Sequence, residues 1–524
     1  MRLSSRALVI FVLCCLASYL LMWRQVRLFD EGIILTGAMR VQAGDLLHRD
    51  FYANYGPAQF YIVAALFQLF AADVMVERAW DIAVRGGIAA LIYLLIASRA
   101  RGVIAFAAAA LAAAWLSSVG NHGYPVYPAL FFSLLAAHLL ERSLTRNSLP
   151  LAACAGVCVA VVTLFRYDVG FFALAALVAG SMFARMPNPA GYAFRLTSEA
   201  LVMAGVTGAI VLTLLATYAA SGALNGFYHD VIDFPARAYV KTRSLPFPPL
   251  EAVWKQRRLL PVVMYLPLFA CVAGLLVLVR KSPGKIPAST ASEDRGSRLL
   301  VVLLIPLTAM FYLKGVVRLG TDQLQLSLIA SIPLLALAWH LSAGRRAVRA
   351  TVNLIWLVNA ASAGAFGYLA ATRDNLMYER PVRIGLGVLH VEPNVEPERD
   401  AALRYVRSNS SPGDRIFVGL ARHDKMIMND VSAYFLSGRM PATKWHQFDP
   451  GLQTSAGIQT EIVRELQARK PKLVWLESSF DWIIEPNESA VSSGVTLLDD
   501  YLRITYRPAA TFGAIQILKR KLEE

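Results

Sequence analysis

The most regular feature of this chain is a series of long apolar runs, separated by short polar segments, that extends from residue 7 to residue 371. A helix needs about 20 predominantly apolar residues to cross the hydrocarbon core of a bilayer. The pattern therefore predicts a polytopic α-helical membrane protein. The predicted spans are 6–23, 79–98, 103–119, 125–140, 149–165, 168–184, 198–220, 259–280, 299–313, 324–342 and 350–371, eleven in all.

A further apolar stretch, Pro57–Ala72, is ambiguous. If it crossed the membrane, every later basic cluster would face outward, against the bias of basic residues toward the cytoplasm. We therefore expect a helix that lies along the outer leaflet or dips into it. The clusters then placed in the cytoplasm are Arg2/Arg6, Arg99/Arg101, Arg142/Arg146, Arg185/Arg195, Arg280/Lys281/Lys285/Arg295/Arg298 and Arg345/Arg346/Arg349.

Two of the outer segments carry many basic residues in spite of this bias. Residues 24–78 contain Arg24, Arg27, Arg40, Arg49 and Arg78. Residues 221–258 contain Arg237, Lys241, Arg243, Lys255, Arg257 and Arg258. An anionic ligand at the outer surface would account for them. Contact with lipid headgroups or incidental surface charge is the alternative, because long loops tolerate such residues.

The C-terminal part, residues 390–524, has a different pattern. Helical periodicity at 397–409 and 457–470 alternates with short apolar runs at 415–420, 472–478 and 512–520 that are typical of strands. We expect a small α/β domain on the outer side, joined by a linker at 372–389 to a membrane domain at 1–371. The polar inner loop 281–298 is expected to lack structure.

Composition agrees with the membrane class, at 56% apolar residues and a mean hydropathy of +0.48. The net charge of +15 gives no indication of nucleic-acid binding, because the predicted topology already explains the basic clusters. The five cysteines all lie in apolar segments and are expected to be core residues, so no metal site is predicted. The first apolar segment has no cleavage signature and is interpreted as a retained span.

The sequence FDEGIILTGAMR at 29–40 places two carboxylates, Asp30 and Glu31, just outside the first span. An acidic pair ringed by arginines at the membrane surface suits a general base beside a phosphate-bearing lipid. The alternative is that the two acids only cap the helix that follows.

The arrangement DEG…GDLLHRDFYANYGPAQFY resembles the GT-C membrane glycosyltransferases, which include protein O-mannosyltransferases and the enzyme that adds aminoarabinose to lipid A. Those enzymes carry an Asp-Glu pair in the first outer loop, then a later Asp and a Pro-containing surface helix, similar to Asp50 and Tyr55-Gly56-Pro57. Further similar positions are Arg85 in RAWDIAVRGG, Arg166 and Asp168 in TLFRYDVG, and Arg318 and Asp322 in RLGTDQLQL. Arg49, next to Asp50, is a further candidate for the site.

The resemblance implies a role for each position. Asp30 would be the general base on the acceptor, and Glu31 would support the site. The donor phosphate would be held by Arg85 and by one or more of four residues of the later outer segment, namely Lys241, Arg243, Arg257 and Arg258. The donor would be a polyprenyl-phosphate sugar, used with inversion on the periplasmic face of a bacterial inner membrane; no cofactor is implied.

The sequence departs from the family at several positions. Asn54 precedes Tyr55 where relatives that modify lipid A have a Lys, the second outer loop offers His122 in place of an acid, and Gln325 stands where relatives often have His. The acceptor, whether lipid, glycan or protein, is left open. A transporter or flippase of lipid-linked sugars, and a cell-envelope glycan polymerase or ligase, are the alternative functions.

Overall fold

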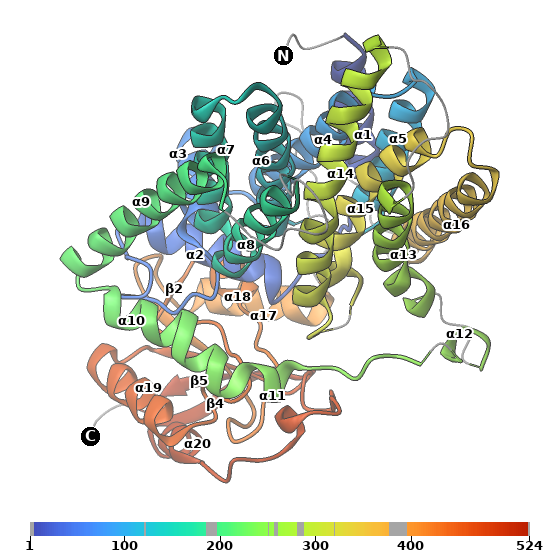
Figure 1. Cartoon of the computed structure of the whole chain (residues 1–524). Helices are drawn as coiled ribbons and strands as arrows, with labels where there is room; N and C mark the ends of the chain where they lie inside the picture. The colour runs from blue at the N-terminus through green and yellow to red at the C-terminus, as the bar shows by residue number, and fades with distance from the viewer. Residues whose placement is uncertain are drawn as a thin grey trace.

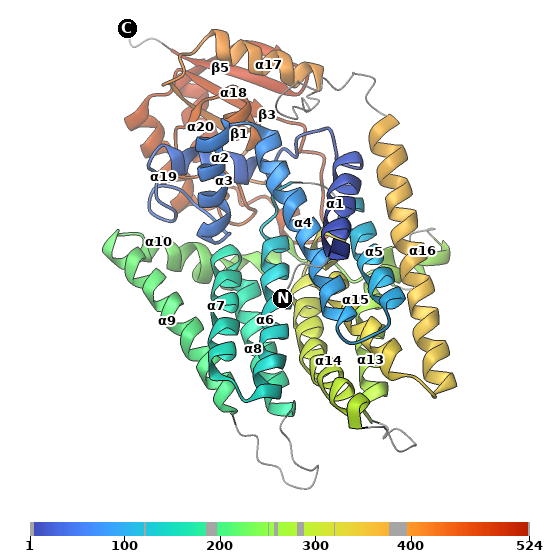
Figure 2. The same cartoon turned by 90° about the horizontal axis from the view of Figure 1, so that it is seen from above.

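The computed structural model describes residues 5–119, 122–184, 196–249, 251–255, 260–279, 288–318, 320–376 and 396–521. Figures 1 and 2 show a bundle of long helices, with the C-terminal domain at one end of it and a layer of shorter helices between the two. Since the C-terminal domain is expected outside the membrane, we call this end of the bundle outer and the opposite end inner.

Each of the eleven predicted spans is a helix. They are α1 (Ser5–Leu20), α4 (Val74–Ala97), α5 (Gly102–Ser118), α6 (Val126–Arg146), α7 (Leu149–Phe165), α8 (Tyr167–Ala184), α9 (Ser198–Ala220), α13 (Leu260–Val279), α14 (Ala288–Gly315), α15 (Thr321–Leu341) and α16 (Arg346–Leu376). Seven helices among the described residues are long and apolar enough to cross a bilayer by themselves. The chain is a multi-pass integral membrane protein.

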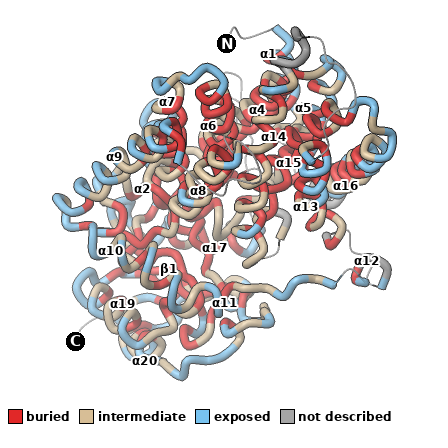
Figure 3. Tube along the Cα trace, viewed as in Figure 1, coloured by how far each residue is buried: buried red, intermediate tan, exposed pale blue. Residues whose placement is uncertain are grey.

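The helices differ in how far other helices cover them. In the most apolar stretch of α15, 89% of the residues are buried inside the protein, whereas in that of α9 only 17% are buried. Figure 3 shows the same contrast, with α15 inside the bundle and α9 at its edge. Because hydrocarbon tails solvate an apolar face as well as protein does, an exposed apolar helix such as α9 fits a lipid boundary.

Two short helices, α2 (Asp30–Gln42) and α3 (Pro57–Phe70), lie next to each other in the layer below the C-terminal domain (Figure 2). At 1.5 Å per residue the 14 residues of α3 reach about 21 Å, less than the ~30 Å hydrocarbon core. The length and the position of α3 agree with the expectation that 57–72 stays in the outer leaflet.

The second outer segment is helical from α10 (Leu224–Tyr228) to α11 (Val240–Arg243) and passes between the span ends and the C-terminal domain (Figure 1). Two π-helical turns, His229–Asp233 and Pro235–Tyr239, interrupt the α-helical hydrogen bonds of this segment. Pro235 lacks the amide hydrogen that a regular turn would use, which favours such a widening. A short helix, α12 (Ala252–Lys255), follows.

The C-terminal domain contains the predicted helices and strands in the predicted order, together with further helices and strands that were not predicted. Its helices are α17 (Pro397–Ser408), α18 (Ser432–Ser437), α19 (Ala456–Arg469), a 3-10 turn at Glu488–Ala490 and α20 (Leu497–Thr505). Its strands are β1 (Arg415–Leu420), β2 (Met440–Pro441), β3 (Leu473–Glu477), β4 (Tyr506–Phe512) and β5 (Ile515–Arg520), in the order β2-β1-β3-β5-β4. The first three are parallel and β5 is antiparallel to both of its neighbours.

Two predicted boundaries are wrong. The second span starts at Val74 rather than at residue 79, so that Arg78 belongs to α4 and not to the first outer loop. The inner loop is helical from Ala288 onward, although residues 288–298 were expected to lack structure. Contacts with neighbouring helices override the polar composition there, because Asp294 forms an ion pair with His340 at 3.4 Å.

Candidate active site at the outer face

Asp30 is the first residue of α2, and its carboxylate does not cap that helix. The N-cap position is Phe29, which has no side-chain capping bond. Asp30 is partly exposed, and no described residue donates a hydrogen bond to its carboxylate. An acid that is neither a cap nor part of a hydrogen-bonded pair keeps both oxygens available for a ligand.

Glu31 has the opposite environment one residue later. Its side chain is fully buried, and Arg78 of α4 binds it through Nε at 2.6 Å and Nη2 at 3.0 Å. The backbone N–H of Arg27 donates to the second oxygen at 2.7 Å. Glu31 therefore anchors the first turn of α2 to α4, a role that Asp30 does not share.

Three arginines place positive charge near the Asp30 carboxylate. They come from three different segments: Arg27 precedes α2, Arg243 ends α11, and Arg318 lies between α14 and α15. The negative charge of Asp322, at the start of α15, acts on Asp30 as well. Burial raises the pKa of Asp30 above its ordinary value, and the three guanidinium groups only partly offset this.

Arg27 and Asp322 join the ends of two segments that are far apart in the sequence. Their side chains form an ion pair at 2.8 Å, and the Arg27 guanidinium lies 4.5 Å from the centre of the Trp23 ring. Both side chains are partly exposed, at 18% and 26%. The pair fixes Asp322 beside Asp30 without excluding a ligand from the site.

The C-terminal domain supplies a carboxylate to each of the other two arginines. Asp449 binds Arg243 Nη2 at 2.5 Å and accepts a hydrogen bond from the Tyr52 hydroxyl at 3.1 Å. Glu485 binds both terminal nitrogens of Arg318, at 2.6 and 2.8 Å. The C-terminal domain, and not the helix bundle, therefore orients both arginines.

A second cluster borders Asp30 on the side of α7 and α8. The Arg166 guanidinium lies 4.9 Å from the ring centre of Tyr55 and 6.0 Å from that of Tyr124, and it forms two bonds of 2.8 and 3.0 Å with Asp168. Lys314 of α14 is 3.8 Å from Asp168. Burial raises the pKa of both phenols, and the Asp30 charge raises it further.

Arg85 lies in a region that we call the buried ion-pair layer, formed by Glu31, Glu77, Arg78, Asp81 and Arg85. Arg85 binds Asp81 at 2.7 Å, donates to the carbonyl groups of Leu116 and Val119, and lies 3.9 Å from the Tyr127 ring centre. Its side chain is fully buried. Contact of Arg85 with a donor phosphate stays a prediction.

The remaining predicted residues lie elsewhere or outside the described part of the chain. Arg49 and Asp50 form a partly exposed pair with each other at 2.8 Å, and Lys241 is exposed. His122 is buried and stacks on Tyr124 with a centroid distance of 5.4 Å, and Gln325 is fully buried in α15. Arg257 and Arg258 lie outside the described residues.

Sequence reasoning missed Asp449 and Glu485 and gave no role to Arg27. The only available signal was a surplus of outer arginines, which we attributed to an external anion or to incidental contacts. For several of them the protein itself provides the acid: Arg27 pairs with Asp322, Arg40 with Asp45, Arg49 with Asp50 and Arg78 with Glu31.

No group of three or more His, Cys, Asp or Glu side chains in the described part of the chain is arranged to hold a metal ion. The site as described is one carboxylate without a hydrogen-bonded partner, Asp30, near guanidinium groups that are themselves paired with other acids, with two phenols at its edge. This arrangement can accept a proton at Asp30 and can stabilise a phosphate dianion or monoanion nearby.

No protein-family model matches the sequence, and no curated protein matches it either. Among solved structures, the oligosaccharyltransferase of Archaeoglobus fulgidus in the apo form has a TM-score of 0.52 over 90% of this chain and 69% of its own, at 13% identity. ArnT from Cupriavidus metallidurans, bound to undecaprenyl phosphate, has a TM-score of 0.46 over 98% and 97%, at 12% identity. The chain has the fold of the GT-C membrane enzymes, which confirms the fold that the sequence resemblance implies.

Proposed function

We propose that this protein is a glycosyltransferase that moves a sugar from a polyprenyl-phosphate donor to an acceptor at the outer face of the membrane. The observation that carries the proposal is the Asp30 carboxylate, which has no hydrogen-bond donor among the described residues and lies within the field of three arginines. A scaffold role would leave Asp30 paired, as Glu31 is.

In the proposed reaction Asp30 takes the proton from the acceptor's hydroxyl or amine. The oxygen or nitrogen of that group attacks the anomeric carbon of the sugar at the same time. The bond from the acceptor to the anomeric carbon forms as the bond from that carbon to the phosphate oxygen breaks. One displacement inverts the configuration at carbon and needs no covalent enzyme intermediate. The raised pKa makes Asp30 a stronger base than an ordinary aspartate once it is ionised.

The leaving group is a polyprenyl phosphate, whose negative charge grows as the bond breaks. We assign its stabilisation to Arg27, Arg243 and Arg318. Each is oriented by a carboxylate of another segment, so little reorganisation is needed when the charge develops. The planar guanidinium also matches the geometry of phosphate oxygens.

The donor class follows from the charge of the site together with the fold. The archaeal oligosaccharyltransferase that shares the fold is also known in a complex with an inhibitory peptide and a dolichol-phosphate. We propose that this protein also uses a polyprenyl-phosphate donor. We assign the reaction to the periplasmic side of a bacterial inner membrane. The acceptor is a lipid, glycan or protein group that carries a nucleophilic hydroxyl or amine.

The test uses purified protein, a mixed pool of polyprenyl-phosphate sugars and membrane extract from the source cell, with release of free polyprenyl phosphate as the readout. We expect release by the native protein and a rate lower by about 100-fold or more for Asp30→Asn, with donor binding retained. A matched control is Asp233→Asn, which removes a carboxylate that pairs with the exposed Arg237.

Equal release by the native protein and Asp30→Asn would contradict the role of Asp30. Movement of lipid-linked sugar across sealed vesicles without any release would instead support a transporter. These two outcomes separate a wrong residue assignment from a wrong reaction class.

A further inference from the structure

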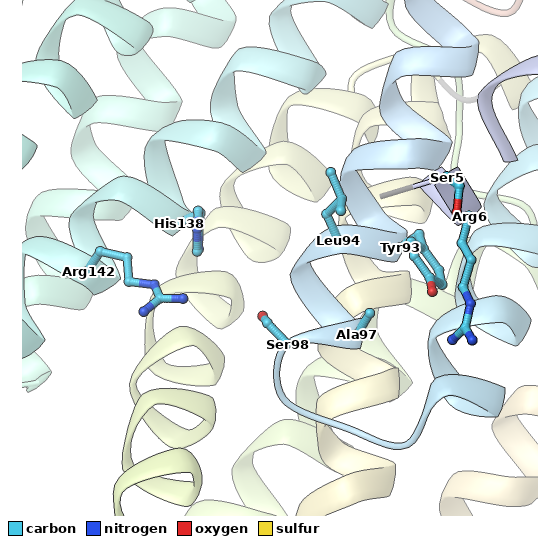
Figure 4. A pocket seen from close by; sticks show the side chains of 8 residues that line it. All are labelled: Ser5, Arg6, Tyr93, Leu94, Ala97, Ser98, His138 and Arg142. Carbon is cyan, nitrogen blue, oxygen red and sulfur yellow. The ribbon is translucent and has the colours of Figure 1, made fainter. Parts of the chain in front are cut away.

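At the inner end of the bundle, α1, α4 and α6 border an open pocket of about 390 Å³. Figure 4 shows Arg6 and Arg142 on opposite sides of this pocket, with Tyr93, Leu94, Ala97 and Ser98 of α4 between them. Ser5 and His138 complete its lining. We call it the inner pocket. It lies at the opposite end of the bundle from Asp30.

The inner pocket has a surplus of positive charge. Three guanidinium groups, those of Arg6, Arg99 and Arg142, lie at or behind its wall, and among the described residues that line or contact it Glu141 supplies the one carboxylate. Arg99 binds Glu141 at 2.5 Å and also contacts His138 Nδ1 at 3.2 Å, and both Arg99 and Glu141 are buried. Glu141 is therefore mostly neutralised by Arg99.

The two arginines that line the inner pocket have few partners of their own. Arg142 Nε is 3.8 Å from Glu141, and the Arg142 side chain is 38% exposed. Arg6 is exposed and forms no ion pair with any described residue. Arg349, another inner arginine, is held more firmly, because it donates to Ser342 Oγ at 2.8 Å and packs 3.8 Å from the Trp339 ring centre. Arg6 and Arg142 lie on opposite sides of the inner pocket, and neither is held in a close ion pair by the described part of the chain.

An apolar stripe on α1 leads directly to Arg6. Val9, Leu13, Leu16 and Leu20 are all at least half exposed. Their spacing from Arg6 of 3, 7, 10 and 14 residues places them on the same face of the helix as Arg6. In a bilayer this face contacts acyl chains, and Arg6 marks the level at which the headgroups begin.

We propose that the inner pocket binds the phosphodiester headgroup of an anionic phospholipid from the cytoplasmic leaflet. Arg6 and Arg142 contact the phosphate oxygens from two sides, and an acyl chain lies along the apolar stripe of α1. Basic pockets between span ends on the cytoplasmic side are suited to such headgroups. Free phosphate offers the same oxygens but would gain nothing from the apolar stripe.

The test compares the native protein with the double variant Arg6→Ala/Arg142→Ala in neutral detergent. Phosphatidylglycerol, phosphatidylcholine or inorganic phosphate is titrated, and binding is followed by native mass spectrometry and by the unfolding temperature. Both altered side chains are exposed, so the double variant should remain folded. The matched control Arg101→Ala/Arg346→Ala removes the same charge from two exposed inner arginines that do not line the inner pocket.

We expect the native protein and the control to bind phosphatidylglycerol in preference to phosphatidylcholine and to unfold at a higher temperature when it is present. The double variant should bind phosphatidylglycerol at least about tenfold more weakly. Equal binding by the double variant would overturn the proposal, as would a native protein that does not distinguish the two lipids. A response to inorganic phosphate as large as that to phosphatidylglycerol would show an anion site that does not select lipid, which also overturns it.

Discussion

Two regions meet at the first turn of α2 and use the same residue types differently. In the buried ion-pair layer, the Glu31–Arg78 and Asp81–Arg85 pairs have side chains that are at most 1% exposed and distances of 2.6–2.7 Å. At the Asp30 site, the arginines are paired with acids from distant segments, and Asp30 alone has no pair. The matched charges build the scaffold, whereas Asp30 is the unmatched carboxylate to which we assign the proposed chemistry.

Burial has opposite consequences for stability in the two regions. Removing one member of a buried pair leaves an uncompensated charge and is strongly destabilising. Asp30 has a raised pKa in the folded state, so its contribution favours folding at low pH and is lost as pH rises through that raised pKa. At neutral pH the ionised Asp30 therefore costs stability, and the same carboxylate is what the proposed reaction requires.

The largest expected effect on stability separates the two neighbouring acids. Glu31→Gln leaves Arg78 buried beside a neutral amide and should lower the free energy of unfolding by about 3–5 kcal/mol. Asp30→Asn should leave it unchanged or raise it, because the charge that burial disfavours is removed. Chemical unfolding in detergent at neutral pH measures both. Equal destabilisation by the two variants would mean that Asp30 is also a scaffold residue.

The next effect concerns Asp449, a positioning residue for Arg243. Asp449→Asn should reduce kcat/KM for the donor by about tenfold or more, because a displaced Arg243 no longer meets the leaving phosphate. Asp449→Glu, which keeps the charge, should recover part of the loss. If Asp449→Asn gives less folded protein but an unchanged kcat/KM, then Asp449 only holds the C-terminal domain on the bundle and does not position Arg243 for the reaction.

Glu485 should matter less, because its pair with Arg318 is more exposed, at 25% and 13%. Glu485→Gln is expected to lower kcat/KM about two- to fivefold, and high salt should weaken the difference between variant and native protein. A salt-independent loss of 100-fold would indicate that Glu485 contacts a substrate directly.

The smallest effect is expected at Lys241, two residues before Arg243 in the same short helix. Lys241 is exposed, whereas Arg243 is buried against Asp449. Lys241→Ala should change kcat/KM by less than about twofold, since an exposed flexible cation adds little to a screened surface. A loss as large as that from Asp449→Asn would place the donor phosphate on the exposed side of α11.

Much of the fold was predictable because hydrophobic length and periodicity are local properties. All eleven spans follow from them, as do α17, α19, β1, β3 and β5 of the C-terminal domain, whereas α18, α20, β2 and β4 were missed. The acidic pair could also be singled out, since its position outside the first span is a local feature. The family resemblance gave Asp30 and Glu31 different roles, but the residues alone could not show why, because the difference depends on which of the two carboxylates binds Arg78 of α4.

The partners of the site arginines could not be predicted, because each pair joins residues that are distant in the sequence. Arg27 and Asp322 are 295 residues apart, Arg243 and Asp449 are 206 apart, and Arg318 and Glu485 are 167 apart. No periodicity or spacing connects such positions. Only the docking of the C-terminal domain on the outer helices brings the last two pairs together.

The central claim is that ionised Asp30 is the base, and the pH dependence of kcat/KM tests it most directly. For the native protein we predict that the rate falls as pH falls through the pKa of Asp30, with a midpoint above the value of about 3.9 for an ordinary aspartate. Asp30→Asn should retain a low rate that no longer shows this acid limb. An unchanged acid limb in Asp30→Asn would contradict the account, because another group would then be the base.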